Sequence, residues 1–386
     1  MGGRTVLVTG ATGFIGGWVA EAMYLSELGR VRAGIKNWAH AARLARWPIE
    51  IVPCDVLDPD QLALAMSGAD LVVHCAVGNR VVVVEGTRNV LAAAQRSGVE
   101  RVVHLSTAEV YGNASGNIAE TCGYQYTGSE YADSKIDAEK LCWEFSSRGL
   151  PVTVLRPSIV YGPFSETWTV NLAARLQSGN WATYDGYGDG ICNLVYIDDL
   201  ISAIVIALTH PRAVGEAFNI VGPQVVTWNQ YFESLNAALG LPELRAASSS
   251  RSRVKSAATD LIRSSSKNVR DHFDQPIGQI RRRFDWADEM VSHLKRLVKS
   301  TPTARELQNL YSRRAIYIAD KACHVLGWEP QTSLEAGLKM SVAWLRLCPP
   351  PPSPVGAGSP RPFGLPDARS MGGVTPPLQE RDGGEV

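Results

Sequence analysis

A glycine-rich segment near the N-terminus restricts the fold more than any other part of the sequence. Residues 9–16 are Thr-Gly-Ala-Thr-Gly-Phe-Ile-Gly, and they lie between the apolar run Thr5–Thr9 and a segment with helical spacing. Gly10 permits a tight turn, Gly13 lets the backbone approach a pyrophosphate, and Gly16 allows close packing of helix on strand. In this context the pattern indicates a dinucleotide-binding loop, with an ordinary strand-to-helix turn as the alternative.

The first half of the chain alternates short β-branched runs with helical patterns, which is typical of repeated βαβ units. The apolar runs are nearly continuous, so we expect strands that are buried on both faces. The expected strands are Thr5–Thr9, Val31–Ile35, Ile49–Pro53, Leu71–Cys75, Arg101–Ser106 and Val152–Arg156. The expected helices are Trp18–Leu28, Gln61–Ser67, Gly86–Ser97, Ala132–Ser147, Asp199–Leu208 and Trp228–Leu239. We therefore predict an α/β fold with a Rossmann-like, doubly wound parallel sheet and a smaller C-terminal substrate domain.

Composition divides the chain into a nucleotide-binding part, a substrate lobe and a tail. The expected organisation is an NAD(P)-binding domain over residues 1–165, completed by about 190–222, and a substrate lobe over 166–189 and 223–347. Within the lobe, residues 245–315 are rich in Ser and Arg, and we interpret them as a solvated basic helical insertion. Contact with phosphate or a membrane surface is the alternative. Residues 348–386 are rich in Pro and Gly and predict a disordered tail.

The charge balance and the cysteines exclude several classes of function. Lys plus Arg and Asp plus Glu both total 38 among 386 residues, so no global field attracts nucleic acid or acidic polymers. The 7 cysteines show no C-x-x-C pair or metal-ligand spacing, which predicts reduced thiols and no metal site. No secretory leader and no apolar run of transmembrane length is apparent, so we expect a cytoplasmic protein.

A tyrosine and a lysine at helical spacing are the strongest catalytic candidates. Tyr131 and Lys135 are four residues apart in an expected helix, so they share one face. A neighbouring ammonium and an oxidised nicotinamide both lower the pKa of a phenol, which suits Tyr131 as an acid/base. Tyr317 and Lys321 have the same spacing, but they follow the basic insertion, and we interpret them as structural. Thr107 ends the fifth strand, where it is expected to bind the reacting oxygen or, alternatively, to cap the turn.

The residues after the second and third strands bear on the choice of cofactor. Lys36 follows Gly16 by about 20 positions, where an acidic residue selects NAD and a basic one accommodates the extra phosphate of NADP. Lys36 therefore favours NADP over NAD, with Arg43 as a second candidate cation, unless Lys36 is simply exposed at a strand end. Asp55 is expected to accept a hydrogen bond from the adenine amino group or to cap its turn.

In its motifs the chain resembles the NAD-dependent epimerase/dehydratase branch of the extended short-chain dehydrogenases over nearly all of residues 4–347. The matching segments are residues 9–16, 54–56, 74–76, 86–89, 106–112, 156–163, 195–199 and 326–330. The glycine loop and the resemblance together imply a cofactor site of Gly10, Thr12, Gly13, Phe14, Ile15, Gly16, Lys36, Asp55, Val56, Ala76, Lys135 and Pro157. The resemblance also implies a homodimer and a small-molecule substrate such as a nucleotide-sugar.

The residues after Thr107 bear on the reaction. Sugar-nucleotide 4,6-dehydratases of the family have an Asp–Glu pair here, in which the Asp protonates the leaving hydroxyl and the Glu is a base. This chain has Ala108 and Glu109, so the missing acid argues against dehydration. Glu109 resembles the second acid/base of uronic-acid decarboxylases and some epimerases. The alternative for Glu109 is a purely structural partner.

Two other departures concern the substrate pocket. Family members that hold a diphosphate often have an Arg where this chain has Cys192, and Arg313 or Arg314 could supply the missing charge from the other lobe. The connection from Ala76 to Gly86 is also shorter than is usual in the family, which removes a loop beside cofactor and substrate.

These observations lead to one main hypothesis and two alternatives. The main hypothesis is an NAD(P)-dependent enzyme acting on a secondary alcohol or ketone, as a nucleotide-sugar epimerase or decarboxylase with transient oxidation does. The enzymatic alternative is an NADP-dependent dehydrogenase or reductase of a 3β-hydroxysteroid or flavonoid-like alcohol. The other alternative is a non-catalytic dinucleotide-binding scaffold.

Overall fold

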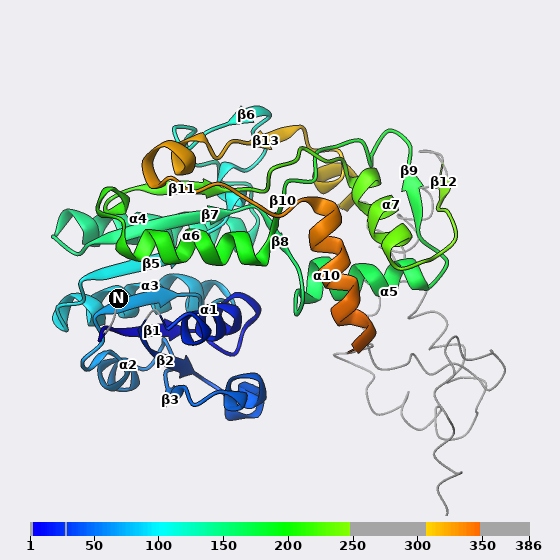
Figure 1. Cartoon of the computed structure of the whole chain (residues 1–386). Coiled ribbons are helices and arrows are strands. Elements are labelled where there is room, and N and C mark those ends of the chain that lie inside the picture. Colours follow the sequence, from blue (N-terminus) through cyan, green and yellow to red (C-terminus); the bar gives the residue numbers. More distant parts are fainter. Residues whose placement is uncertain (1–2, 28, 248–305, 348–386) are drawn as a thin grey trace, which may run out of the picture. The chain divides into compact units, whose positions relative to one another are not determined.

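The structure is a computed structural model that describes residues 3–27, 29–247 and 306–347. Its centre is a seven-stranded sheet in the order β11-β7-β5-β4-β1-β2-β3, in which neighbouring strands are parallel (Figure 1). The strands are β1 (Thr5–Thr9), β2 (Arg30–Ile35), β3 (Glu50–Pro53), β4 (Leu71–His74), β5 (Arg101–Leu105), β7 (Val152–Pro157) and β11 (Ala217–Ile220). The strand order reverses between β1 and β4, so the predicted Rossmann-like, doubly wound sheet is confirmed.

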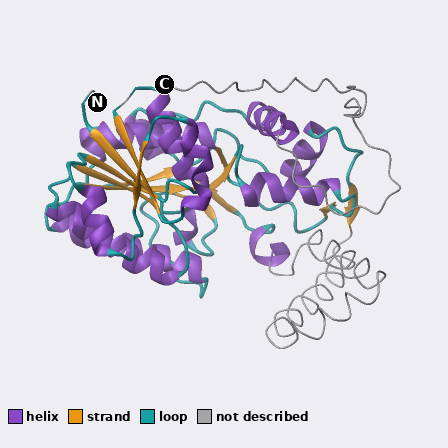
Figure 2. Cartoon of the chain, turned by 90° about the horizontal axis from the view of Figure 1, so that it is seen from below, coloured by secondary structure: helices purple, strands orange, loops and turns teal. Residues whose placement is uncertain are grey.

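Helices cover both faces of the sheet, as Figure 2 shows for the fan of strands between them. Successive side chains of a strand point to opposite faces. Val6 and Val8 of β1 therefore pack into one core cluster, and Leu7 packs into another. The helices of the first cluster are α1 (Phe14–Leu25) and α6 (Ile197–Thr209), and those of the second are α2 (Pro59–Met66), α3 (Arg80–Arg96) and α4 (Glu130–Ser147). The carboxyl ends of the parallel strands are thus left open for the site.

Helix α3 begins at Arg80, earlier than the expected Gly86. The sequence Val81–Val84 is a run of β-branched residues, which have low intrinsic helix propensity. In the structure the side chain of Asn79 caps the helix by accepting a hydrogen bond from the N–H of Val82. Capping and packing on α4 therefore outweigh the local preference of the valines.

The second half of the chain forms a group of short elements beside the sheet. These are β8 (Ile159–Tyr161), η3 (Glu166–Val170), α5 (Asn171–Gln177), β9 (Ala182–Tyr184), β10 (Leu194–Tyr196), α7 (Trp228–Ala238), β12 (Arg245–Ala247), η5 (Glu306–Leu310), β13 (Ala315–Tyr317), η6 (Ala322–Leu326) and α10 (Leu334–Leu347). Trp228 and Phe232 of α7 pack against Tyr311, with ring centroids 4.8 and 5.3 Å away. These rings belong to the same core cluster as Val6 and Val8 of β1, so the short elements share a continuous core with one face of the sheet.

The remaining elements lie near the sheet, and three predictions fall outside the described residues. The elements are η1 (Trp38–Arg46), η2 (Ala108–Tyr111), β6 (Gly116–Ile118) and η4 (Pro211–Ala213). The basic insertion predicted within residues 245–315 falls mainly on residues 248–305, which are not described, and the same holds for Leu28 and the tail at 348–386. No helix among the described residues is long and apolar enough to cross a membrane.

We expect Gly16→Ala to destabilise the fold, because a Cβ at this position would lie 2.3 Å from the carbonyl oxygen of Gly10. Overpacking of this kind costs about 1–3 kcal/mol. Gly123→Ala is the control, because Gly123 is exposed and a Cβ there meets no atom within 4 Å. Chemical denaturation measures the free energy of unfolding of both variants. Equal unfolding free energies for the two variants would contradict the importance of the close approach.

Candidate active site

The glycine loop leaves no room for side chains where β1 turns into α1. Gly10 has a φ of +67°, and a Cβ there would lie 2.8 Å from the Cα of Ala76. Gly13 is the N-cap of α1, and no side chain of the described residues caps this helix. The first N–H groups of α1 therefore face the loop without a side-chain acceptor. This cradle fits a dinucleotide pyrophosphate, which a helix N-terminus stabilises.

The other residues expected at the cofactor lie in the loop or at the carboxyl ends of neighbouring strands. Thr12, Phe14 and Ile15 are half-buried in and directly after the loop. Val56 is buried after β3, and Pro157 is buried at the end of β7. Parallel sheets bind ligands at this edge, so the positions fit a cofactor that crosses the ends of the strands.

Lys36 and Asp55 meet at the ends of β2 and β3. The Nζ atom of Lys36 lies 2.8 Å from a carboxylate oxygen of Asp55, and the Lys36 side chain is 65% exposed. Burial alone would raise the pKa of Asp55, but hydrogen bonding and charge from Lys36 outweigh it and lower the pKa. Asp55 also accepts a hydrogen bond from the N–H of Leu57, at 3.1 Å. The structure thus contains the capping contact of Asp55. The contact of Asp55 with the adenine remains an expectation.

Arg43 is not placed as a second cation for a phosphate. Its guanidinium donates to Glu21 from Nε and Nη2, at 3.0 and 2.8 Å. It is also stacked on two rings, 4.7 Å from the centroid of Trp18 and 4.0 Å from that of Phe164. The sequence could not show this, because Phe164 lies far along the chain. The expectation for Arg43 is therefore corrected to a structural role.

The structure brings Thr107 and Tyr131 together. Thr107 follows β5 and is buried, whereas Tyr131 lies in the first turn of α4 and is 45% exposed. Although much of the ring is exposed, the protein groups around the hydroxyl partly desolvate it and raise the pKa of Tyr131, and a hydrogen bond with Thr107 opposes that rise. Thr107 also accepts a hydrogen bond from the N–H of Glu109, at 3.2 Å, as a cap would. The capping contact of Thr107 is therefore present in the structure, and its contact with the reacting oxygen stays a prediction.

Lys135 lies one helical turn after Tyr131, on the same face of α4. Its side chain is buried, and Nζ donates to the carbonyl oxygen of Leu105 at 2.7 Å. Burial lowers the pKa of Lys135 to about 8, although nearby acidic groups, including Glu139, oppose the shift. The ammonium is thus held rigidly under the end of β5.

Glu109 forms an ion pair with Arg313. The Nη1 atom of Arg313 lies 2.6 Å from Oε1 of Glu109, and only 16% of the Arg313 side chain is exposed. Burial would lower the pKa of Arg313, but the charge of Glu109 outweighs it and raises the pKa. Of the two arginines considered from sequence, Arg313 is therefore the one that reaches the catalytic candidates. Negative charge on Glu109 also contributes to the raised pKa of Tyr131.

Two further sequence features are structural. Cys192, which stands where diphosphate-binding relatives have an Arg, is 0% exposed and belongs to the core. Tyr317 is buried beside Arg313, and burial raises the pKa of Tyr317 to about 12. Lys321 instead donates to Glu216, at 2.6 Å. The second Tyr–Lys pair is thus split, and its two members face different partners.

A buried ion pair at the site was missed in the sequence. Glu139 of α4 is 0% exposed. Its Oε2 accepts hydrogen bonds from Nε of Arg156, at 3.1 Å, and from Nη2 of Arg156, at 2.7 Å. Arg156 directly precedes Pro157, and Glu139 follows Lys135 by four residues. The signal was therefore present, since an acidic residue continued the helical stripe of Tyr131 and Lys135.

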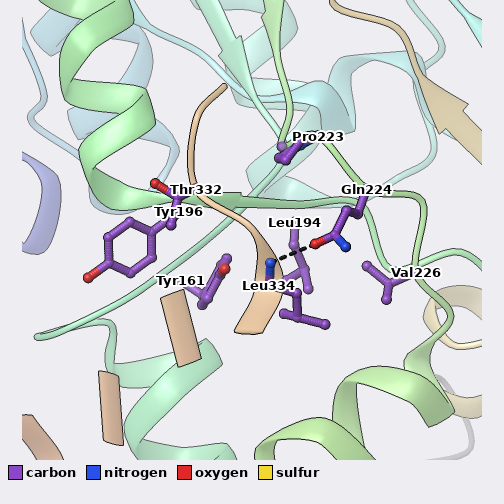
Figure 3. Close-up of a pocket in the computed structure, with 9 residues that line it drawn as sticks. Tyr161, Leu194, Tyr196, Pro223, Gln224, Val226, Thr332 and Leu334 are labelled. Carbon is purple, nitrogen blue, oxygen red and sulfur yellow. Dashed lines mark hydrogen bonds between the residues drawn. The ribbon is translucent and has the colours of Figure 1, made fainter. Parts of the chain in front are cut away.

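A small pocket lies elsewhere, beside the loop that precedes α10 (Figure 3). Tyr161 and Tyr196 line it, and the side chain of Gln224 closes one side by accepting a hydrogen bond from the N–H of Leu334, at 2.6 Å. None of its lining residues is a catalytic or cofactor candidate, so it is not the expected substrate site. Among the described residues no group of three or more His, Cys, Asp or Glu side chains is placed to hold a metal ion.

Known proteins are similar to this chain in sequence and in structure. Cinnamoyl-CoA reductase 1 of Oryza sativa subsp. japonica is 34% identical over 239 residues, which cover 55% of this chain and 70% of that protein. UDP-N-acetyl-alpha-D-glucosaminuronate decarboxylase of Bacillus cytotoxicus is 28% identical, with 56% and 74% covered. The crystal structure of UDP-glucuronic acid 4-epimerase from Bacillus cereus in complex with UDP-glucuronic acid and NAD has a TM-score of 0.66 at 20% identity, with 89% of this chain and 100% of that chain covered.

The family follows from the match of a family model. The model of the NAD dependent epimerase/dehydratase family matches residues 6–221, which are more than half of the chain. Those residues include the glycine loop, six of the seven strands of the sheet in full and the catalytic candidates on α4. This agreement of sequence, fold and site geometry shows that the chain belongs to the NAD-dependent epimerase/dehydratase family of enzymes.

Proposed function

We propose that this chain transiently oxidises a secondary hydroxyl of a nucleotide-activated sugar and then reduces the ketone again, in the manner of an epimerase or a decarboxylase. The observation that carries the proposal is the ion pair between Glu109 and Arg313. It brings a carboxylate and a guanidinium from distant parts of the chain to the side of Thr107 and Tyr131. A nucleotide-sugar decarboxylase and a UDP-glucose 4-epimerase match more than half of the chain, which supports the proposal.

In this proposal three side chains handle the hydroxyl proton. Thr107 binds the reacting oxygen, and Tyr131 takes the proton as a general base and later returns it. The Lys135 ammonium stabilises the phenolate, because an opposite charge favours the ionised form of a phenol. Bound NAD or NADP supplies the remaining chemistry, which is the acceptance and return of a hydride.

Glu109 is the second acid/base of the proposed reaction. Paired with a guanidinium, its carboxylate is available as a base, which suits proton removal at the carbon beside a transient ketone. Ala108 has no proton to give to a leaving hydroxyl, so Ala108 and Glu109 together lack the acid that dehydration needs. The arrangement therefore favours epimerisation or decarboxylation.

Arg313 provides the positive charge for an anionic part of the substrate. Cys192 cannot do so, because it is buried in the core. A guanidinium binds phosphate or carboxylate groups with paired hydrogen bonds. We also propose that residues 166–189 and 223–347 form the substrate lobe, and that the enzyme is a cytoplasmic homodimer, as the sequence led us to expect.

The proposed cofactor is NADP, or else NAD. The glycine loop holds the pyrophosphate, and Asp55 lies where the adenine is expected. Lys36 supports NADP, because its exposed ammonium stands where the extra phosphate would lie. The ion pair between Lys36 and Asp55 is exposed on the lysine side and is therefore easily rearranged when a phosphate binds.

The proposed function predicts that the purified protein retains its nucleotide and turns over without net change of it. We expect mass spectrometry of the denatured protein to detect released NAD or NADP. With UDP-glucose or UDP-glucuronic acid, NMR should show a new sugar product while nicotinamide absorbance stays constant. Tyr131→Phe should lower this turnover by at least about 100-fold, because the acid/base is lost.

Tyr126→Phe is the matched control for that experiment, because Tyr126 is an exposed phenol shortly before α4 that donates to Asp137. It should leave the turnover unchanged. Stoichiometric oxidation or reduction of the nicotinamide with a hydroxysteroid or flavonoid-like alcohol would instead establish a simple dehydrogenase. Binding of a dinucleotide without turnover of any of these substrates would support the non-catalytic scaffold.

The choice of NADP predicts that Lys36→Glu reverses the cofactor preference. Calorimetric titration should show a loss of NADP affinity of about tenfold or more relative to NAD, since a charge-assisted hydrogen bond to phosphate is replaced by repulsion. Arg30→Glu is the control, because Arg30 is an exposed cation at the opposite end of β2. An unchanged ratio of affinities in Lys36→Glu would contradict the assignment.

A further inference from the structure

Three residues of α4 form one stripe under the crevice. Tyr131, Lys135 and Glu139 follow each other at intervals of four, so their side chains lie on the same helical face. Their burial increases along the stripe, from 45% exposure at Tyr131 to 4% at Lys135 and 0% at Glu139. The stripe therefore runs from the open crevice to the interior, and Glu139 is its buried end.

The carboxylate of Glu139 is held from three elements at once. Arg156 at the end of β7 donates to both oxygens, with Nε 3.1 Å from each. Ser106, directly after β5, donates from its hydroxyl to Oε1. Tyr124 donates from its hydroxyl to Oε2, at 2.9 Å. The hydrogen bonds that this carboxylate accepts thus come from three residues outside α4.

Arg156 is itself fixed by further contacts. Its Nη1 donates to the hydroxyl of Tyr111, at 2.8 Å, and that hydroxyl donates to Asn219 on β11, at 2.7 Å. The guanidinium also lies over the rings of Tyr111 and Tyr124, 5.1 and 5.3 Å from their centroids. A buried ion pair is costly unless its remaining hydrogen bonds are satisfied, and here they are.

The ends of the strands that carry this network also carry the site. Ser106 is the neighbour of Thr107, and Arg156 is the neighbour of Pro157. We propose that Glu139 is a positioning residue. It holds the end of β5, and therefore Thr107, at a fixed position relative to the face of α4 that carries Tyr131. The inference rests on the catalytic roles proposed above, in which Glu139 touches neither substrate nor cofactor.

The electrostatics of Lys135 agree with this role. The groups that face it are the thiols of Cys75 and Cys142, the imidazoles of His74 and His104, and the carboxylate of Glu139. Burial raises the pKa of both thiols and lowers the pKa of both imidazoles, so these four groups are neutral at neutral pH. Glu139 is then the charged neighbour that favours the ammonium form of Lys135.

The most direct variant, Glu139→Gln, would leave the charge of Arg156 buried without its partner and is expected to unfold. Two hydroxyl deletions keep every charge in place. Ser106→Ala removes the donor to Oε1, on the side of Thr107, and Tyr124→Phe removes the donor to Oε2. Both variants lose one hydrogen bond to the same carboxylate. Tyr124→Phe also removes the acceptor of the Trp143 indole N–H, at 2.7 Å, so its cost to stability should be at least as large as that of Ser106→Ala.

The readout is the ionisation of Tyr131, which needs neither substrate nor turnover. Ultraviolet absorbance is titrated for each protein and for the same protein with Tyr131→Phe, and the difference gives the phenolate of this residue. In Ser106→Ala we expect its pKa to rise by about one unit, because the hydrogen bond from Thr107 that lowers it is weakened. In Tyr124→Phe we expect no change.

Thermal unfolding of both variants is measured beside the titration. An equal or larger loss of melting temperature in Tyr124→Phe, with a shift of the Tyr131 pKa confined to Ser106→Ala, supports the positioning role. Unchanged titrations in both variants, or equal shifts in both, would show that Glu139 only stabilises the fold. A failure of the proposed sugar chemistry would not alter this result, because it would appear in the turnover assay and not in the titration.

Discussion

The close approach of three backbone segments at the reversal of strand order is the constraint on which the cofactor site depends. The end of β1, the start of α1 and the residue after β4 meet there. Gly10 lies at this point, and a Cβ added to it would lie 2.8 Å from the Cα of Ala76. A side chain at Gly10 would collide with the backbone after β4, and one at Gly16 of α1 would collide with the carbonyl oxygen of Gly10. Because α1 is this close, its N-terminus points at the crevice, and the backbone itself becomes the anion site.

The other half of the crevice is built on side-chain charge. Lys135 and the pair of Glu139 and Arg156 lie under β5 and β7, in an interior where an unpaired charge is costly. Each charge is satisfied by a strand end: Lys135 by the carbonyl of Leu105, and Glu139 by Ser106 and Arg156. The two halves of the crevice thus depend on different interactions. Close backbone packing shapes the proposed nucleotide site, and buried charged side chains surround the residues proposed to transfer the proton.

The sequence predicted those features that depend on local pattern, and it failed where distant residues decide. The glycine loop and six of the seven sheet strands have a recognisable local pattern and were predicted at nearly the observed positions, whereas β11 was not predicted as a strand. Helix α3 was placed too late, because its cap and packing outweigh a run of valines. Arg43 and Glu109 have partners 22 and 204 residues away, and no local pattern shows which of several charges will meet.

The partner of Glu109 bears most directly on the net reaction. Thr107, Tyr131 and Lys135 would move the same proton in every reaction considered, so they cannot distinguish epimerisation from decarboxylation or simple oxidation. The guanidinium of Arg313 donates from Nη1 to Glu109, while its Nε is buried and faces away from solvent. The ion pair fixes the carboxylate of Glu109 beside Thr107 and Tyr131, where the proposed second acid/base would act. In the proposed reaction this position suits a base acting beside a transient ketone, and the neighbouring acid of a dehydratase is not needed because no hydroxyl leaves.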